Sequence, residues 1–119
     1  HSSSIDNGDV PLYMGQECGF MIRGEGKCIY VSGDTDIMAD MEWMGDYYKP
    51  DVGILSAGGH FTMDMKAAAY AAKRYFNFST VIPAHYRTFP LLAQDAKPLV
   101  DGLPNVDVIE PQVLEPIKI

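Results

Sequence analysis

Three residues whose side chains bind metals or move protons stand just after short apolar runs of the sequence. Asp34 follows "CIYVSG", His60 follows "VGIL" and a glycine turn, and His85 ends "TVIPA". Each run has the length and composition of a buried strand. The carboxyl ends of parallel strands lie along one edge of an α/β sheet, where ligands bind. We therefore expect one carboxylate and two imidazoles to converge at that edge.

Aspartate and histidine are the ligands that zinc and similar divalent metals take in proteins. A carboxylate can bridge two ions, and a two-metal site generates a hydroxide nucleophile near neutral pH. A histidine that is not a ligand can donate a proton to a leaving group. Each residue also has a structural alternative: Asp34 as a helix cap, His60 as a helix-end residue and His85 as a core histidine. Their wide spacing is not a motif in itself.

The elements that would position these residues are predicted from periodicity and turn signals. Two strands flank "GEG", a hairpin signal, and strands then alternate with helices. This order predicts an α/β fold with helices packed on a sheet. The expected strands are 20–23, 28–32, 52–55, 80–85 and 106–111, the expected helices are 37–48, 63–76 and 91–100, and residues 1–15 form a loop with a short extended piece at 10–14.

Two polar residues are expected to begin helices. Asp36 precedes "IMADMEWMGDYY", and Thr62 precedes the alanine-rich "MDMKAAAYAAKRYF". The glycine pair before His60 allows the backbone to turn sharply off the strand. A cap at Thr62 would then fix the position of His60.

Composition excludes several classes of partner. The chain of 119 residues has 16 acidic and 9 basic side chains, a formal charge of −7, which disfavours nucleic acid and anionic membrane surfaces. No apolar run reaches the ~18–20 residues of a membrane span, and no signal peptide is visible. Cys18 and Cys28 lie in strand-like segments without metal-binding spacing, so buried free thiols are expected, with a disulfide as the alternative if adjacent strands align them. Free thiols favour a cytoplasmic location.

The segments around the three residues resemble a known family. "SGDTD" with Asp34, "GGHFTMDMKAA" with His60 and "IPAHYRTFP" with His85 together resemble the C-terminal half of the metallo-β-lactamase superfamily, in particular its poorly characterised branch of metal-dependent hydrolases. The opening "HSSS" is similar to that branch too. The resemblance covers essentially the whole chain. It implies half of an αββα sandwich: one mixed sheet with flanking helices, with metals at one edge.

The resemblance also implies roles for individual residues. Asp34 would be the metal-bridging carboxylate, His85 the last histidine ligand, and His1 the middle histidine ligand. His60 would assist the leaving group, by analogy with transfer-RNA-processing and phospholipase-like relatives, so that His60 and Asp34 form the catalytic set. The cofactor would be one or two divalent ions, zinc first, with manganese or iron as alternatives.

The chain departs from the superfamily in one respect. The main metal motif, H-x-H-x-D-H, is missing, because the only histidines stand at 1, 60 and 85. A single sheet with its helices would also expose an apolar face, which a lone domain rarely tolerates. We therefore expect residues 1–119 to be one partial domain, completed by an absent N-terminal half or by self-association through that face.

The expected function is that of a metal-dependent hydrolase. A metal-bound hydroxide would attack an ester, lactone, amide or phosphoester of a small-molecule substrate, in a longer chain or with a partner chain. Tyr86, Arg87 and Thr88 leave the same strand end as His85 and either shape the pocket or pack locally. The alternative function is a non-catalytic half-domain that associates with itself or another chain. Phosphate binding at "SGDTD" is a weaker idea, because no P-loop glycine pattern is present.

Overall fold

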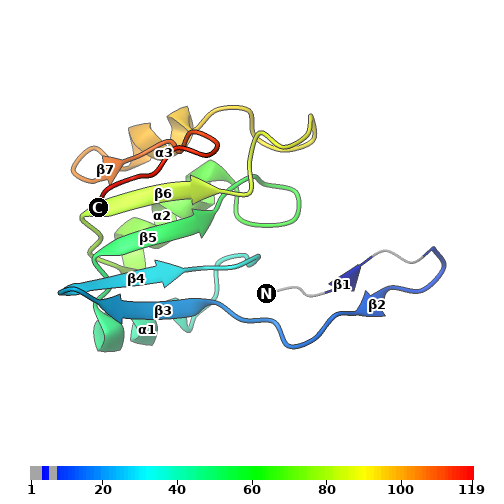
Figure 1. Cartoon of the computed structure of the whole chain (residues 1–119), viewed down its shortest axis with the longest axis horizontal. Helices are drawn as coiled ribbons and strands as arrows, with labels where there is room; N and C mark the ends of the chain where they lie inside the picture. The colour runs from blue at the N-terminus through cyan, green and yellow to red at the C-terminus, as the bar shows by residue number, and fades with distance from the viewer. Residues whose placement is uncertain (1–3, 6–7) are drawn as a thin grey trace.

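Five strands form one sheet in the order in which they occur along the chain (Figure 1). The computed structural model describes residues 4–5 and 8–119. Within the sheet β3 is antiparallel to β4, and the other neighbours are parallel, so the sheet is mixed, as predicted. The strands are β3 (Phe20–Gly24), β4 (Lys27–Val31), β5 (Val52–Ser56), β6 (Thr80–Ala84) and β7 (Asp107–Val108).

The predicted hairpin is confirmed as the β3–β4 pair. Phe20 lies opposite Val31 and Gly24 lies opposite Lys27, which leaves a two-residue turn. The turn residues Glu25 and Gly26 have φ angles of 50° and 77°. Tight hairpins need positive φ at both central positions, and glycine supplies one of them without strain.

The helices α1 (Met41–Tyr48), α2 (Met65–Tyr75) and α3 (Lys97–Gly102) begin later than predicted. Helix α2 is capped by Asp64, whose Oδ1 accepts a hydrogen bond of 2.7 Å from the Ala67 amide. The predicted cap at Thr62 is therefore wrong, because its hydroxyl donates to the Met63 carbonyl instead.

The predicted cap at Asp36 is wrong as well. Its carboxylate accepts a hydrogen bond from the next amide, Ile37, and α1 begins only at Met41. Residues 91–96, predicted as helix, form turns, since the Gln94 side chain amide donates to the carbonyls of Phe89 and Leu92. Side-chain bonds of this local kind compete with helical pairing.

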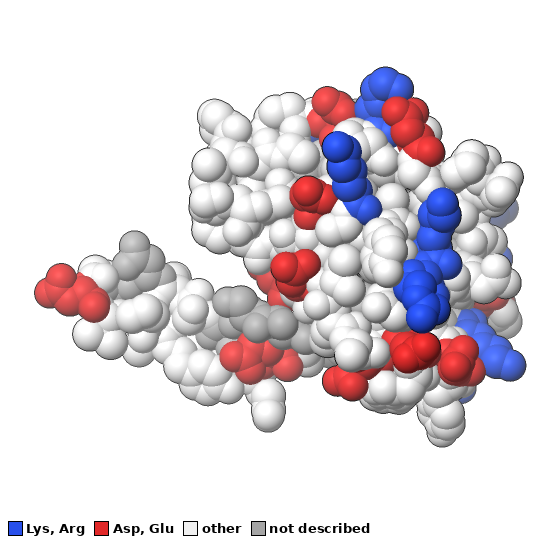
Figure 2. Space-filling view, turned by 180° about the vertical axis from the view of Figure 1, so that it is seen from behind, with Lys and Arg blue, Asp and Glu red and all other residues white. Residues whose placement is uncertain are grey.

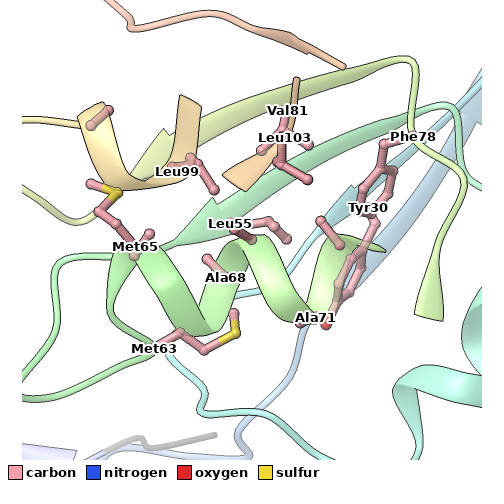
Figure 3. Packing of buried hydrophobic residues seen from close by; sticks show 14 of the residues in the cluster. Tyr30, Leu55, Met63, Met65, Ala68, Ala71, Phe78, Val81, Leu99 and Leu103 are labelled. Atoms are coloured by element: carbon pink, nitrogen blue, oxygen red, sulfur yellow. The ribbon is translucent and has the colours of Figure 1, made fainter. Parts of the chain in front are cut away.

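All three helices lie behind the sheet in Figure 1. Because strand order follows chain order and such crossovers share one hand, each helix returns on the same face. Tyr30, Leu55 and Val81 point from three neighbouring strands into a buried cluster with Ala68 of α2 and Leu99 of α3 (Figure 3). The outer side of the helices carries charged side chains of both signs (Figure 2).

The opposite face of the sheet is apolar, and within the described residues no helix covers it. Phe20 and Ile22 of β3 are 58% and 53% exposed, and Ile29 and Ile54 are half-buried. Towards β6 the face is better covered, with Ile82 buried. One sheet with helices on one side therefore leaves an apolar surface open.

The segment before β3 projects from the sheet as an arm (Figure 1). It holds a small antiparallel pair, β1 (Ser4–Ile5) and β2 (Leu12–Tyr13), the second within the predicted extended piece. Cys28 is buried as predicted, but Cys18 is exposed because it lies on this arm; neither forms a disulfide. Among the described helices, none is long and apolar enough to cross a lipid bilayer.

Candidate metal centre

Asp34 and His85 lie in contact at one edge of the sheet. Asp34 follows β4 and His85 follows β6, and His85 Nε2 is 3.4 Å from Asp34 Oδ2. Their strands are not neighbours, since β5 lies between them. The two side chains therefore meet across the end of β5, at the carboxyl ends of parallel strands where we predicted them to converge.

The end of β5 orients the Asp34 carboxylate. The Ser56 hydroxyl donates a hydrogen bond of 3.4 Å to Asp34 Oδ1, which leaves Oδ2 facing His85. Ser56 is itself fixed, because its amide donates to the Ser32 hydroxyl at 3.0 Å. Sequence reasoning missed Ser56, although a polar residue ending an apolar strand was the signal that had singled out the other site residues.

Backbone hydrogen bonds hold the three strand-end loops together. The Met63 amide donates to the Thr35 carbonyl at 3.1 Å, joining the loops after β5 and β4. The Ala93 amide donates to the Gly58 carbonyl at 2.9 Å, joining the loops after β6 and β5. The loops that carry Asp34, His60 and His85 thus form one connected edge.

Gly58 brings two of these loops into close contact. A Cβ atom at this position would lie 1.9 Å from the carbonyl oxygen of His85. Real Cβ contacts are never so short, so only glycine allows the chain to pass here. The first glycine of "GGH" therefore serves the approach of His85 rather than a turn.

The backbone is strained at the candidate site residues. His60 and His85 have φ angles of 61° and 57°, and Arg87, two residues further, has 64°. Left-handed conformations are uncommon for residues other than glycine and cost roughly 1–2 kcal/mol each. Such residues cluster at functional sites, where the surrounding structure holds them in place.

The donor set at this edge fits a divalent metal ion. Two ligand atoms that each lie about 2.0–2.1 Å from a tetrahedral zinc are about 3.3–3.4 Å apart, and Nε2 and Oδ2 are 3.4 Å apart. The side chains are 30% and 43% exposed, so the edge is accessible. Across residues 4–5 and 8–119, no group of three suitable donors is assembled. His1, the third predicted ligand, lies outside the described residues.

His60 stands on the same edge but is exposed. Its ring packs edge-on against Phe61, with centroids 4.4 Å apart, and Phe61 in turn lies 6.3 Å from Phe89. In the part of the chain that the structure describes, the His60 imidazole has no hydrogen-bond or ion-pair partner. The structure thus bonds the loop of His60 to the loops of Asp34 and His85, and no described hydrogen bond or ion pair joins the ring itself to that pair.

Tyr86 and Arg87, the residues after His85, contact a carboxylate that sequence reasoning missed. Arg87 Nη2 lies 2.6 Å from Glu110 Oε2, and the buried Tyr86 hydroxyl is 3.4 Å from the same oxygen. Burial raises the pKa of Tyr86; Glu110 raises it too, whereas Arg87 lowers it. Glu110 lies near the end of the expected strand 106–111, but nothing in the sequence pairs it with Arg87, 23 residues away.

Comparison with known proteins bears on this site. The chain is 69% identical over all 119 residues to a UPF0173 metal-dependent hydrolase of Ruegeria sp. strain TM1040, and 71% identical to one of Cereibacter sphaeroides strain ATCC 17029. The predicted resemblance is thereby confirmed. The chain spans about half of these metal-dependent hydrolases, 52% of their length. No family model matches the chain.

Solved structures confirm the fold class. Igni18, described as a novel metallo hydrolase from Ignicoccus hospitalis, superposes with a TM-score of 0.70 at 35% identity. The match covers 79% of this chain and 42% of that one. An isothiocyanate hydrolase from Delia radicum gut bacteria matches with a TM-score of 0.52 at 15% identity, which shows the fold alone. The chain thus has the mixed α/β fold found in part of a metallo hydrolase.

Proposed function

We propose that this chain is part of a metal-dependent hydrolase in which Asp34 and His85 hold a divalent ion. The observation that carries the proposal is the 3.4 Å contact between Nε2 and Oδ2 across the end of β5. The names of the relatives, metal-dependent hydrolases, support it. A divalent ion held by Asp34 and His85 would polarise a substrate oxygen and lower the pKa of a bound water molecule.

Each residue at this edge of the sheet has a distinct proposed role. Ser56 donates to one oxygen of Asp34, and the other oxygen lies 3.4 Å from His85 Nε2, so these two atoms are the proposed ligands. His60, exposed at the same edge, is the proposed proton donor to the leaving group. His1 is the proposed third ligand. Zinc is the proposed metal, since Asp and His suit it, and manganese and iron are the alternatives.

The proposed substrate is a small molecule with an ester, lactone, amide or phosphoester bond, and the proposed location is cytoplasmic. We further propose that the rest of the protein covers the open apolar face around Phe20 and Ile22, which are more than half exposed. Burial of the part of each side chain that is still exposed would contribute about 1–2 kcal/mol. The second sheet of the sandwich implied by the resemblance would provide that cover.

The test uses the full-length protein, stripped of metal and titrated with Zn²⁺ against a chromophoric chelator. Asp34→Asn and His85→Ala should each weaken binding at least a hundredfold. Asp101→Asn, which removes an exposed carboxylate on α3, is the matched control and should leave binding unchanged. Zinc affinity that survives both site variants would refute the assignment.

The role of His60 is tested separately from metal binding. His60→Gln should retain zinc affinity within about twofold while lowering turnover of a cleaved ester, lactone, amide or phosphoester by about 10²–10⁴. Loss of zinc together with activity would instead make His60 a ligand. Unchanged turnover would remove it from the mechanism.

The open apolar face favours a second candidate function. Phe20 and Ile22 on the edge strand β3 give the chain a surface suited to pairing with another copy or another protein, without catalysis. Metal analysis separates the two candidates. Stable oligomers that hold no metal and dissociate on Ile22→Lys would support the interaction module and count against catalysis.

A further inference from the structure

We propose that Arg87 and Glu110 position His85 for metal binding by tying its loop to the sheet. We refer to these two residues as the Arg87–Glu110 clamp. The inference rests on the proposed function, since it assigns to the clamp the orientation of a metal ligand. In this proposal Arg87 has a role that differs from the two expected from the sequence, which were shaping the pocket and packing locally.

The clamp joins two segments that are far apart in the sequence. Arg87 Nη2 donates to Glu110 Oε2 at 2.6 Å, and the Tyr86 hydroxyl donates to the same oxygen at 3.4 Å. The Arg87 guanidinium also lies over the Tyr86 ring, 4.9 Å from its centroid. Charge-assisted bonds of this kind are stronger than neutral ones. The two residues that follow His85 are thus bound to one carboxylate.

Arg87 also closes the loop that begins at His85. Its Nε donates to the Gln94 carbonyl at 3.0 Å, and its amide donates to the Ala93 carbonyl at 2.9 Å. The Ala93 amide in turn donates to the Gly58 carbonyl. One arginine therefore contacts the far end of its own loop, which is itself bonded to the loop after β5.

Glu110 stands on a rigid part of the molecule. The preceding amide, Ile109, donates to the Val81 carbonyl at 3.0 Å, which continues the pairing of β7 with β6. Glu110 is therefore held at the edge of the sheet beside β6, the strand that His85 follows. A contact with this carboxylate therefore anchors the His85 loop to the sheet and not to another loop.

The His85 ring lacks the support that metal-binding histidines usually have. In most metal sites the second ring nitrogen donates to a carboxylate or a carbonyl, which fixes the orientation of the ring. Here Nδ1 is buried, and no described residue is its hydrogen-bond partner. Without that hydrogen bond, the position of the ring depends more strongly on its backbone, which takes φ values of 57° at His85 and 64° at Arg87. The clamp holds this disfavoured backbone in place.

The test measures Zn²⁺ affinity of the full-length protein by chelator competition, with no substrate present. Arg87→Ala and Glu110→Ala should each weaken affinity about tenfold, as expected when a supporting contact of a metal ligand is lost. The loss in the double variant should be smaller than the product of the two single losses, because both substitutions remove the Arg87–Glu110 contact. Glu110→Gln keeps an acceptor oxygen and should restore part of the affinity.

The matched control is Asp101→Asn, which breaks the Lys97–Asp101 ion pair of 2.8 Å on α3 and should change nothing. Arg87→Ala and Glu110→Ala affinities within about twofold of wild type would overturn the clamp. So would losses that multiply in the double variant, or a Glu110→Gln variant as weak as Glu110→Ala.

A failure of the proposed function has a different signature. If the wild-type protein binds no Zn²⁺, the metal site is wrong, and the clamp is then judged by amide hydrogen exchange. Glu110→Ala should speed exchange at the amides of Arg87 and Ala93, which are bonded within the clamped edge. Exchange rates equal to those of wild type would overturn the clamp independently of the metal.

Discussion

Asp34 and His85 meet across the end of a strand to which neither belongs. The atoms in contact, Oδ2 and Nε2, are 3.4 Å apart, and β5 with its terminal Ser56 lies between the two parent strands. The side chain of Ser56 donates to the second Asp34 oxygen. The geometry of the Asp34–His85 pair therefore depends on a third residue, Ser56.

Ser56→Ala should weaken zinc binding by about three- to tenfold, because Asp34 loses the hydrogen bond that orients its carboxylate. The unfolding midpoint should fall only slightly, since the bond is long. Chelator competition measures the first effect and thermal unfolding the second. Ser79→Ala removes a serine hydroxyl bonded to the Asp51 carbonyl, away from the candidate site, and serves as control. Equal zinc affinity in both variants would show that Ser56 has no part in the site.

Gly58→Ala should destabilise the protein by about 2–4 kcal/mol, because the new methyl group would collide with the His85 carbonyl at 1.9 Å. Displacement of His85 should also weaken zinc binding. Gly24→Ala, at a glycine with no atom within 4 Å of its would-be Cβ, is the control and should cost under about 1 kcal/mol. Urea unfolding measures both. A Gly58→Ala variant as stable as Gly24→Ala would contradict the close approach.

Tyr30→Phe should raise the free energy of unfolding by about 1 kcal/mol at neutral pH. The Tyr30 hydroxyl is fully buried, and no described residue is its hydrogen-bond partner, so its removal relieves a desolvation cost. Tyr70→Phe, at an exposed tyrosine, should leave stability unchanged. Urea unfolding at pH 7 measures both variants, and a less stable Tyr30→Phe would contradict the unpaired state of the hydroxyl.

The same tyrosine predicts a loss of stability in alkali. Burial raises the pKa of Tyr30 to about 12, whereas the unfolded chain titrates near its ordinary value of 10.0. Between these values the unfolded chain releases its proton and the folded chain keeps it, so stability falls as pH rises from about 10 to about 12. Tyr30→Phe should flatten this decline in unfolding experiments across that range. An identical fall in stability in both proteins would show that another group causes it.

The sequence predicted the strands better than the helix ends. An apolar run such as "TVIPA" predicts a strand because every residue of a buried strand contributes to the pattern, so no single residue decides it. Helix starts depend on which of several nearby polar side chains takes the cap. Asp64 caps α2 because it directly precedes Met65, and its carboxylate accepts a hydrogen bond of 2.7 Å from the Ala67 amide, three residues on. Thr62 lies two residues further upstream, and its hydroxyl donates to the Met63 carbonyl.

The candidate site, too, was predictable from the sequence only in part. The convergence of Asp34 and His85 follows from strand ends alone, and the structure shows it. The roles of Ser56 and Glu110 depend on which side chains meet across the sheet, and that requires the register between strands. Gly58 could be recognised as a glycine, but only the position of the His85 carbonyl explains why it must be one.

The agreement between strand order and chain order has a consequence for how the edge is assembled during synthesis. The strands β4, β5 and β6 leave the ribosome in the order in which they pair, and His85 follows the last of them. Asp34 and Ser56 can therefore be in place before the imidazole arrives. Docking of β6 on β5 delivers it, so metal capture by this pair would report the docking of β6, before β7 is added, in a growing chain.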